Sequence, residues 1–457
     1  MNISFLQNQN IFSNSLSISL IGFFVFGFFL IFGRKFKLAV QLERFGLPIA
    51  VISGIVGISI GPYGLINILS KETTNVWSNF PTPLLSLVFA TLMMGRPIPN
   101  INGLFRPIVN QFLLALSLGF GQFFVGGLVV KYLLSPSMET NPLMGCLIEV
   151  GFEGGHGAAS IIGESFNKLG FSDGLDLGLA MATMGLLSSS LLGSFFIFLG
   201  RTLGISDTEQ IVDKTYDENP KLKISVFSDL RILLINLGFV GLAISFGILI
   251  LNLLRYISNY FGEFSREVIL SLPVFPLILI GSLLIRYILE KTNNTEFISN
   301  LLQREIGILS TDLLIFTAMA SLDIATVLDN WRLILVLTIF GLIWNLICIA
   351  YFAYFVFEKH WFERSLIEFG NSTGVVASGL LLLRLADPKN ISKTLPIFTS
   401  KQLFAQLILS GGFFTVLAPL LISKIGLDYW TEICASITLF TILVAFFFNK
   451  RFSTSYQ

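Results

Sequence analysis

The chain has 457 residues, of which 54% are apolar and only 12% are charged, and its formal net charge at pH 7 is +1. Soluble globular domains carry about 25% charged residues. The composition therefore excludes a soluble protein and predicts a polytopic membrane protein whose excess apolar surface contacts the lipid bilayer. A net charge near zero also argues against nucleic acid as a partner.

The three cysteines lie inside separate apolar runs and share no CxxC spacing. This pattern favours buried apolar side chains over a disulfide framework or a metal site. Residues 1–15 contain no basic segment of the kind that opens a cleaved signal peptide. We therefore expect the first helix to be retained.

A helix that crosses a bilayer needs roughly 20 mostly apolar residues. Eleven stretches meet this criterion, five in each half of the chain and one extra near the C-terminus. The expected crossings are 15–33, 47–69, 81–97, 108–133, 175–200, 229–253, 267–287, 306–324, 331–357, 400–424 and 430–449. Between the fourth and fifth crossing of each half lies a shorter segment interrupted by glycine, at 142–172 and at 364–388. We interpret both as re-entrant hairpins that enter and leave on the same side of the membrane.

An internal repeat relates the two halves. The sequence Leu-Ile-Glu-x-Gly occurs at Leu147–Gly151 and again at Leu366–Gly370, 219 positions later (366 − 147 = 219). Because each half contains an odd number of crossings, the second must insert upside down relative to the first, as in inverted-repeat transporters. The expected divisions are an N-terminal repeat at 1–200, a polar cytoplasmic linker at 201–228, an inverted C-terminal repeat at 229–424, and an extra helix with a cytoplasmic tail at 425–457.

The distribution of basic residues sets the expected orientation. If the N-terminus is outside and the hairpins do not cross, 22 of the 29 lysines and arginines fall on the inner side, Arg364 and Lys401 among them, and seven fall outside (29 − 7 = 22). Cytoplasmic loops of membrane proteins are enriched in lysine and arginine. We therefore predict that the N-terminus is outside and the C-terminus is cytoplasmic.

The first hairpin carries Gly154-Gly155-His156-Gly157 directly after Glu153, in the middle of an apolar sequence. Glycine costs about 1 kcal/mol relative to alanine in a helix. We expect the helix to break there, exposing backbone amides that attract carboxylates and carbonyls that suit Na⁺. Glycines that only allow close helix packing are the alternative, but the accompanying histidine and glutamates favour a site. His156 would donate to substrate, cap the broken helix or, as the minority interpretation, relay a proton.

The second hairpin carries Asn371, Ser372 and Thr373 directly before Gly374. Short hydroxyl and amide side chains suit a polar substrate or a hard cation. Serine and threonine also bond back to their own helix, but their place beside a glycine favours the binding site. Arg384 is the nearest cationic side chain on the C-terminal side. It would pair with a substrate carboxylate or extend to the membrane surface.

Other polar side chains would line the pathway or bind the cation. Glu149 and Glu368 hold the same position in the two repeats. They would be sodium ligands or anchors of the hairpin base, and their place early in each hairpin favours the anchoring role. Gln402, Gln406 and Ser410 lie at i, i+4 and i+8, which is one face of a helix. The predicted cation ligands are Glu153, Ser160, Thr183, Gly370, Gln402 and Gln406.

The stretch Phe152-Glu153-Gly154-Gly155-His156-Gly157-Ala158-Ala159 and the helix expected after it resemble the bacterial sodium/glutamate symporter family. The resemblance extends from Gly33 to Pro419. It implies two inverted five-helix repeats, each with a re-entrant loop, and an elevator-type mobile unit that binds substrate and Na⁺ near the hairpin tips.

By motif, the resemblance assigns binding to Gly154, Gly155, His156 and Gly157 in the first hairpin and to Gly370 and Gly374 in the second. The chain departs from the family pattern at Glu153, where the family has a small polar residue. Its second motif contains fewer glycines, and it has an extra C-terminal helix.

We therefore predict a secondary transporter, not an enzyme, that imports L-glutamate with Na⁺ and uses no cofactor beyond this coupling ion. Its expected location is the plasma (inner) membrane of a bacterium, and its long apolar helices with glycine faces are compatible with a homodimer. The alternatives are a carrier of another small carboxylate, such as aspartate or citrate, and a membrane-embedded enzyme in which His156 and Glu153 form an acid–base pair.

Overall fold

The computed structural model describes residues 80–95, 97–98, 104–205 and 228–448 except 261, 271, 358, 389 and 390, together with positions 54, 57–59 and 77. The predicted crossing at 15–33, nearly all of that at 47–69, most of the predicted linker and the C-terminal tail lie outside the described residues. Within the described residues all regular structure is helical, and seven helices are long and apolar enough to cross a membrane. The prediction of a polytopic all-helical membrane protein is confirmed at this level.

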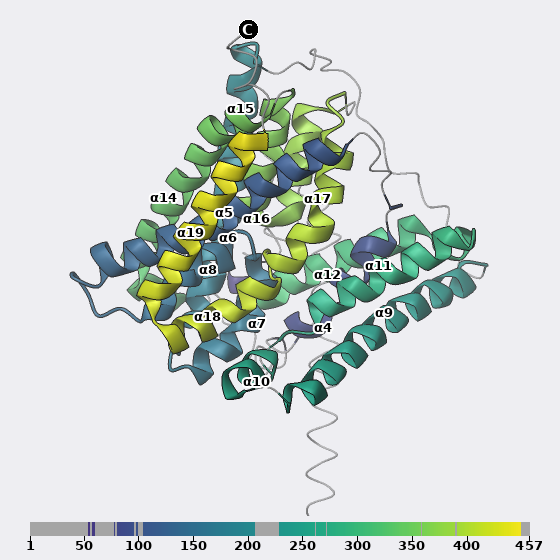
Figure 1. Cartoon of the computed structure of the whole chain (residues 1–457), viewed down its shortest axis with the longest axis horizontal. Helices are drawn as coiled ribbons and strands as arrows, with labels where there is room; N and C mark the ends of the chain where they lie inside the picture. Colours follow the sequence, from purple (N-terminus) through teal and green to yellow (C-terminus); the bar gives the residue numbers. More distant parts are fainter. Residues whose placement is uncertain are drawn as a thin grey trace, which may run out of the picture.

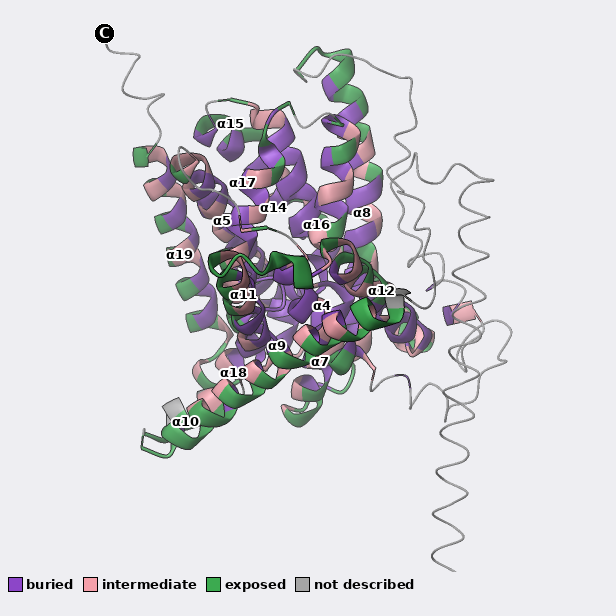
Figure 2. Cartoon of the chain, turned by 90° about the vertical axis from the view of Figure 1, so that its right-hand side faces the viewer, coloured by how far each residue is buried: buried purple, intermediate pink, exposed green. Residues whose placement is uncertain are grey.

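The helices form two packed groups (Figure 1). The first group, here called the outer bundle, contains α4 Pro81–Met94, α9 Ser228–Ser258, the short α10 Glu263–Leu270, α11 Phe275–Lys291 and α12 Asn300–Ala320. Much of the surface of α9 and α10 is exposed, whereas α4 is largely buried (Figure 2). Exposed leucines and isoleucines recur along α9, as expected for a helix that faces lipid.

The second group, here called the core bundle, is built around three long helices and carries the two predicted hairpins. Its long helices are α5 Phe105–Val129, extended by a π-helical turn at Val130–Leu134; α8 Gly174–Thr202; and α14 Trp331–Ile347, extended by a π-helical turn at Cys348–Phe352 and by α15 Ala353–Val356. The short α13 Ile324–Asp329 precedes α14, and the extra C-terminal helix α19 Leu427–Phe448 packs along α5.

Two predicted crossings are interrupted. The stretch expected at 267–287 divides into α10 and α11, because Pro273 lacks the backbone N–H that a continuous helix needs. The stretch expected at 400–424 begins earlier and divides into α17 Thr394–Ile408 and α18 Phe413–Ile425. Between them Ser410 (φ 57°) and Gly411 (φ +85°) adopt left-handed backbone conformations, so Ser410 does not continue the helical face of Gln402 and Gln406.

The segment at 142–172 doubles back on itself. It consists of a 3₁₀ turn at Pro142–Cys146, α6 Leu147–Phe152, and α7 Gly155–Lys168. The side-chain amide of Asn141, just before it, lies 3.5 Å from the carbonyl oxygen of Gly170, near its end. The chain therefore enters and leaves this segment at one place.

The second hairpin is contained in α16 Trp361–Ala386, whose backbone is non-helical at Gly374 and Val375. A Cβ atom on Gly370 would lie 2.5 Å from the Cα atom of Gly379. In a continuous helix these two residues would be separated by about 13 Å along the axis. The two arms of α16 therefore fold back against each other, and the absence of side chains at both glycines allows the close approach.

Helix α8 contacts both hairpins at its opposite ends. Near its start, Gly178 faces Ala159 of α7. Gly193, nearer its C-terminal end, faces Leu382 of the second arm of α16. Between them, Gly185 lies against the backbone of Thr373 and against Phe152. The two hairpins thus approach from opposite ends of α8 and meet beside its middle.

Candidate functional site

The tips of the two hairpins are in direct contact. Gly155, at the start of α7, has a φ of +67°, and a Cβ atom at this position would lie 2.4 Å from Cγ1 of Val375 in α16. Val375 itself has a φ of 62°, which is a strained conformation for a β-branched residue. The breaks predicted from the glycines therefore lie next to each other in space.

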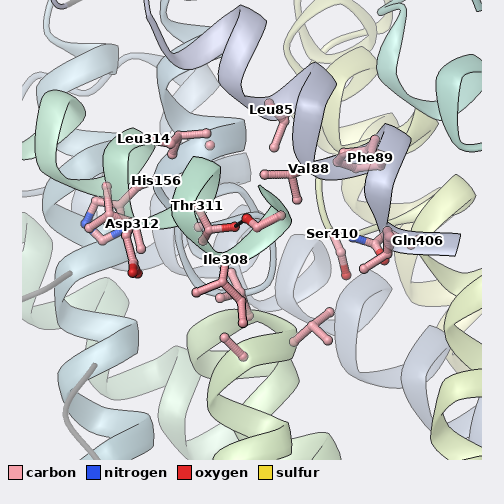
Figure 3. A pocket seen from close by; sticks show the side chains of 18 of the residues that line it. Leu85, Val88, Phe89, His156, Ile308, Thr311, Asp312, Leu314, Gln406 and Ser410 are labelled. Carbon is pink, nitrogen blue, oxygen red and sulfur yellow. Dashed lines mark hydrogen bonds between the residues drawn. The ribbon is translucent and has the colours of Figure 1, made fainter. Parts of the chain in front are cut away.

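A cavity of about 260 Å³ opens at this contact (Figure 3). The core bundle contributes the hairpin tips, at 152–157 and 374–377, together with Gln406 and Ser410 from the end of α17 and the break after it. The outer bundle contributes the opposite wall, from α4 and α12. Most of the lining is apolar with a few polar groups, which is typical of small-molecule sites.

Two helices begin at the cavity. Helix α7 starts at Gly155, and the second arm of α16 starts after Val375; both starts line the cavity. The first turn of a helix has backbone N–H groups without intrahelical partners and carries a partial positive charge. Two such turns facing one cavity can bind a carboxylate.

Two buried glutamates of the first hairpin have unsatisfied oxygens. Oε1 of Glu149 accepts hydrogen bonds from the hydroxyl of Thr415 (2.7 Å) and the backbone N–H of Ser410 (3.3 Å). Oε1 of Glu153 accepts one from the hydroxyl of Ser410 (2.8 Å). In the described part of the chain, Oε2 of each glutamate has no hydrogen-bond partner, and neither has Oε1 of Gln406. Buried carboxylate oxygens are costly without a partner, so this group is suited to a cation.

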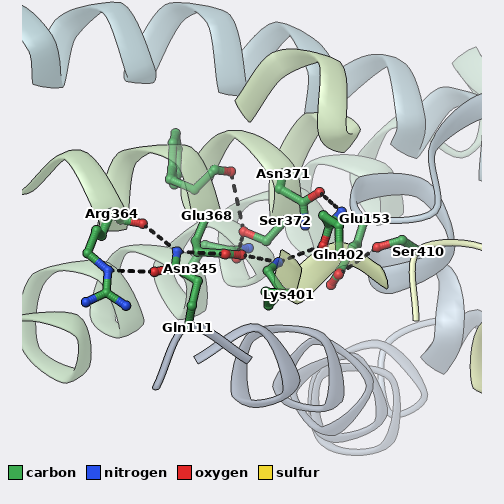
Figure 4. Close-up of polar contacts among 11 residues, drawn as sticks. Gln111, Glu153, Asn345, Arg364, Glu368, Asn371, Ser372, Lys401, Gln402 and Ser410 are labelled. Atoms are coloured by element: carbon green, nitrogen blue, oxygen red, sulfur yellow. Dashed lines mark hydrogen bonds and ion pairs between the residues drawn. The ribbon is translucent and has the colours of Figure 1, made fainter. Parts of the chain in front are cut away.

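The second hairpin presents a connected polar network in which both oxygens of Glu368 are paired (Figure 4). Nζ of Lys401 lies 2.9 Å from Oε2 of Glu368 and donates to Oε1 of Gln402 (2.8 Å). Nε2 of Gln402 donates to Oδ1 of Asn371 (3.0 Å), and Nε2 of Gln111 donates to Oε1 of Glu368 (2.8 Å). Helix α17 therefore holds the first arm of α16 through buried polar contacts.

Ser372 is anchored on its other side by the long helices. Its hydroxyl donates to Oδ1 of Asn345 in α14 (2.7 Å), and its carbonyl oxygen accepts from Nε2 of Gln122 in α5 (2.7 Å). These contacts fix the backbone just before the break at Gly374.

His156 forms a local hydrogen bond rather than a link to a glutamate. Its Nε2 lies 3.1 Å from the hydroxyl of Thr183, which itself donates to the carbonyl of Leu179. Because the threonine proton is used, Nε2 of His156 is the donor in this pair. Ser160 donates to the carbonyl oxygen of His156 (2.7 Å). Both contacts fix the first turn of α7.

The cavity brings together part of the predicted site. Glu153, the Gly154–Gly157 turn, Gly374 and Gln406 line it. Asn371 and Gln402 form the network beside it, and Thr183 and Ser160 contact His156.

Three predicted residues lie elsewhere. Gly370 packs against Gly379. The hydroxyl of Thr373 donates back to the carbonyl of Phe369 (2.5 Å), which is the local bonding considered as the alternative for this run. Arg384 is exposed and is not among the residues that line the cavity.

The sequence interpretation missed two cationic residues. Lys401 and Arg364 were assigned to the inner loops, but both are buried inside helices. The signal for Lys401 was its place between Ser400 and Gln402, in a polar cluster of an apolar helix. Arg304 of α12 lines the cavity together with Asp312.

Gly119 of α5 tests the packing around Glu153. An alanine Cβ atom at 119 would lie 2.8 Å from Oε2 of Glu153 and 2.6 Å from Cδ1 of Leu409. We expect Gly119→Ala to destabilise the protein by about 1–3 kcal/mol, measured as a lower unfolding temperature in detergent. Gly241→Ala is the control, because no atom of the described residues lies within 4 Å of a Cβ atom there. Equal behaviour of the two variants would contradict this placement of Glu153.

A sequence model of the family described as sodium/glutamate symporter matches residues 16–361, which is 346 of the 457 residues. No curated protein matches the chain. One solved structure that matches is the sodium proton antiporter MjNhaP1 from Methanocaldococcus jannaschii at pH 8, with 14% identity, a TM-score of 0.38, and coverage of 89% of this chain and 99% of that chain. The family match covers most of the chain, and we conclude that the chain belongs to the sodium/glutamate symporter family.

Proposed function

We propose that this protein imports L-glutamate across the plasma membrane of a bacterium, driven by Na⁺ entry, and that both bind where the hairpin tips meet. One observation carries this proposal beyond family membership. Among the described residues, buried oxygens of Glu153 and Gln406 that have no hydrogen-bond partner line a cavity on which two helix N-termini converge, and Glu149 shares Ser410 with Glu153. The oxygens without partners suit a cation, and the helix N-termini suit a carboxylate.

Sodium binds in this proposal at the carboxylates of the first hairpin. The two Oε2 atoms and Oε1 of Gln406 supply oxygen ligands of the kind that hard cations prefer. Without a cation, two neighbouring buried carboxylates repel each other and lack solvation. Na⁺ binding removes both costs and fixes the first hairpin in the geometry that accepts substrate.

Glutamate binds next to this cation, with one carboxylate on the amides at the start of α7 and of the second arm of α16. Arg304, on the opposite wall, is a cationic partner for the second carboxylate, and Asp312 is an anionic partner for the amino group. His156 lines the cavity at the first tip, and Asn371 supports the second tip through its hydrogen bond with Gln402. Aspartate and citrate space their carboxylates differently from glutamate. With one carboxylate on the helix N-termini, neither would place a second carboxylate at the same distance from Arg304, so the site would distinguish glutamate from both.

Transport by an elevator-type movement is consistent with this arrangement. Both hairpins, α8 and α17 belong to the core bundle, whereas the outer bundle supplies only the wall formed by α4 and α12. Movement of the core bundle along that wall would carry the hairpin tips with their bound Na⁺ and glutamate from one surface to the other, and would break the contacts of glutamate with Arg304 and Asp312 on the wall. Na⁺ offsets part of the carboxylate charge of the first hairpin, which lowers the cost of moving the site across the membrane.

The proposed topology has two inverted five-helix repeats, at 1–200 and 229–424, joined by the cytoplasmic linker 201–228 and followed by the extra helix in 425–457. Segments 142–172 and 364–388 are re-entrant hairpins from opposite surfaces, which leaves eleven crossings. The N-terminus is outside, the C-terminus is cytoplasmic, and the protein forms a homodimer. The approach of the two hairpins from opposite ends of α8 supports this scheme.

Uptake of labelled glutamate into proteoliposomes tests the proposed function. We expect accumulation when an inward Na⁺ gradient is imposed, and none when the gradient is collapsed with an ionophore or replaced by K⁺. Unlabelled aspartate and citrate, added as competitors, report the substrate class. Chemical conversion of glutamate without accumulation, or accumulation that is equal without Na⁺, would contradict the proposal.

His156→Asn tests whether a titrating proton takes part. Asparagine keeps a donor near Thr183 but cannot be protonated, and a neutral hydrogen bond contributes only about 0.5–1.5 kcal/mol. We therefore expect sodium-driven uptake to survive within roughly tenfold. Loss of all uptake in a variant that purifies as a folded protein would instead support proton transfer through His156.

A further inference from the structure

The two hairpins share one motif but place its glutamate in different surroundings. Glu149 and Glu368 are the third residues of the two Leu-Ile-Glu-x-Gly sequences, 219 positions apart (368 − 149 = 219). Both side chains are fully buried. Oε2 of Glu149 has no hydrogen-bond partner in the described part of the chain, whereas both oxygens of Glu368 are paired.

The group that pairs Glu368 is an ammonium in a site built for a cation (Figure 4). Nζ of Lys401 lies 2.9 Å from the Glu368 carboxylate, 2.8 Å from the amide oxygen of Gln402, and 4.6 Å from the centre of the Phe398 ring. A carboxylate oxygen, an amide oxygen and an aromatic face all attract positive charge. Lys401 has no exposed surface.

The first hairpin has no lysine at the matching place. Counting the same 219 positions back from Lys401 gives Ala182 (401 − 219 = 182), in α8. An alanine provides no charge, and the unsatisfied oxygens of Glu149 and Glu153 remain. The repeat thus places a carboxylate site in each hairpin, and among the described residues a side chain of the chain itself fills the second site and not the first.

We propose that Lys401 is a built-in cation that occupies the cation site of the second hairpin, so that Na⁺ binds only at the first. This inference rests on the proposed function. It adds that the coupling Na⁺ binds in the first repeat and not in the second. A tethered ammonium keeps Glu368 neutralised in every state of the cycle, because it cannot dissociate. The site at Glu149 and Glu153 fills and empties with Na⁺ and therefore carries the coupling.

The test compares the wild type with Lys401→Met and with Lys401→Met/Glu368→Gln. Methionine keeps an unbranched chain of similar length but leaves Glu368 as an uncompensated carboxylate. The double variant removes both charges. Thermal unfolding of each purified protein is followed in detergent over a range of NaCl at constant ionic strength, without glutamate, and the flux ratio of ²²Na⁺ to glutamate is then measured in proteoliposomes.

We expect Lys401→Met to bind one more Na⁺ than the wild type. Its unfolding temperature should depend more steeply on NaCl, its flux ratio should rise by one Na⁺ per glutamate, and the double variant should return to wild-type behaviour. If Lys401→Met is monodisperse only when purified in Na⁺, that result also supports the proposal. The proposal would be overturned if Lys401→Met depended on sodium as the wild type does. Aggregation of this variant both with and without Na⁺ would also overturn it, because Glu368 would then form no cation site.

The design separates this inference from the proposed function. A wild-type protein that Na⁺ does not stabilise and that takes up no glutamate contradicts the proposed function. A wild type that responds to Na⁺, paired with a Lys401→Met variant that responds identically, contradicts the assignment of Lys401 alone.

Discussion

Replacing Glu153 by glutamine is expected to raise the Na⁺ concentration needed for half-maximal glutamate uptake by roughly 10- to 100-fold. Contacts made by a charged group contribute about 1.5–3 kcal/mol, and each 1.4 kcal/mol corresponds to about tenfold in affinity. Glutamine retains the size of the side chain and an oxygen that can accept from Ser410, but removes the negative charge. The measurement is initial uptake in proteoliposomes over a range of NaCl.

Glu164→Gln is the matched control for this prediction. Glu164 also lies in the first hairpin, but it is exposed and forms an ion pair with Lys168 four residues later. Exposed ion pairs contribute little, so its sodium dependence should equal that of the wild type. If Glu153→Gln and Glu164→Gln behaved alike, the cation would not bind at Glu153.

Gly155→Ala is expected to disrupt the contact between the hairpin tips and abolish most uptake. Alanine is disfavoured at a φ of +67° by about 1–2 kcal/mol, and its Cβ atom would overlap Cγ1 of Val375. Overpacking of this kind adds roughly 1–3 kcal/mol. Both the unfolding temperature in detergent and the rate of sodium-driven uptake should fall.

The second half of this experiment combines Val375→Gly with Gly155→Ala in a double variant. Val375 supplies the only atoms within 4 Å of the new Cβ atom among the described residues, and its own positive φ suits glycine. The double variant should therefore recover much of the stability lost in Gly155→Ala, leaving only the backbone cost at 155. A double variant that is less stable than Gly155→Ala would show that the tips do not meet as described.

The sequence was informative where polar residues and glycine interrupt apolar helices. Glu153 and the Gly154–Gly157 turn could be singled out because such a run is expensive at membrane depth without a function or a partner. The doubling back of both segments also agrees with expectation, since glycine at 155 and 374 lowers the cost of breaking a helix. These predictions depend on local composition, which a single sequence contains.

Contacts between residues that are far apart in the sequence could not be predicted from local composition. The ion pair of Glu368 with Lys401 joins α16 to α17, and the hydrogen bond of Ser410 to Glu153 joins the break after α17 to the tip of the first hairpin. From the sequence, Lys401 resembled a residue at the cytoplasmic end of a helix, because a basic residue near an apolar stretch is more often at its end than buried. The break at Ser410 was missed because apolar residues on both sides suggest one continuous crossing, and the tertiary contacts with Glu149 and Glu153 stabilise the unwound turn.

The account depends on two hairpins that enter from opposite surfaces of the membrane, and cysteine labelling in intact cells tests this most directly. Lys168 and Pro388 are exposed residues at the ends of the first and second hairpin, and the three native cysteines are buried. We expect Lys168→Cys to react with a membrane-impermeant maleimide from outside, and Pro388→Cys to react only after permeabilisation. Labelling of both positions from the same side would contradict the proposed architecture.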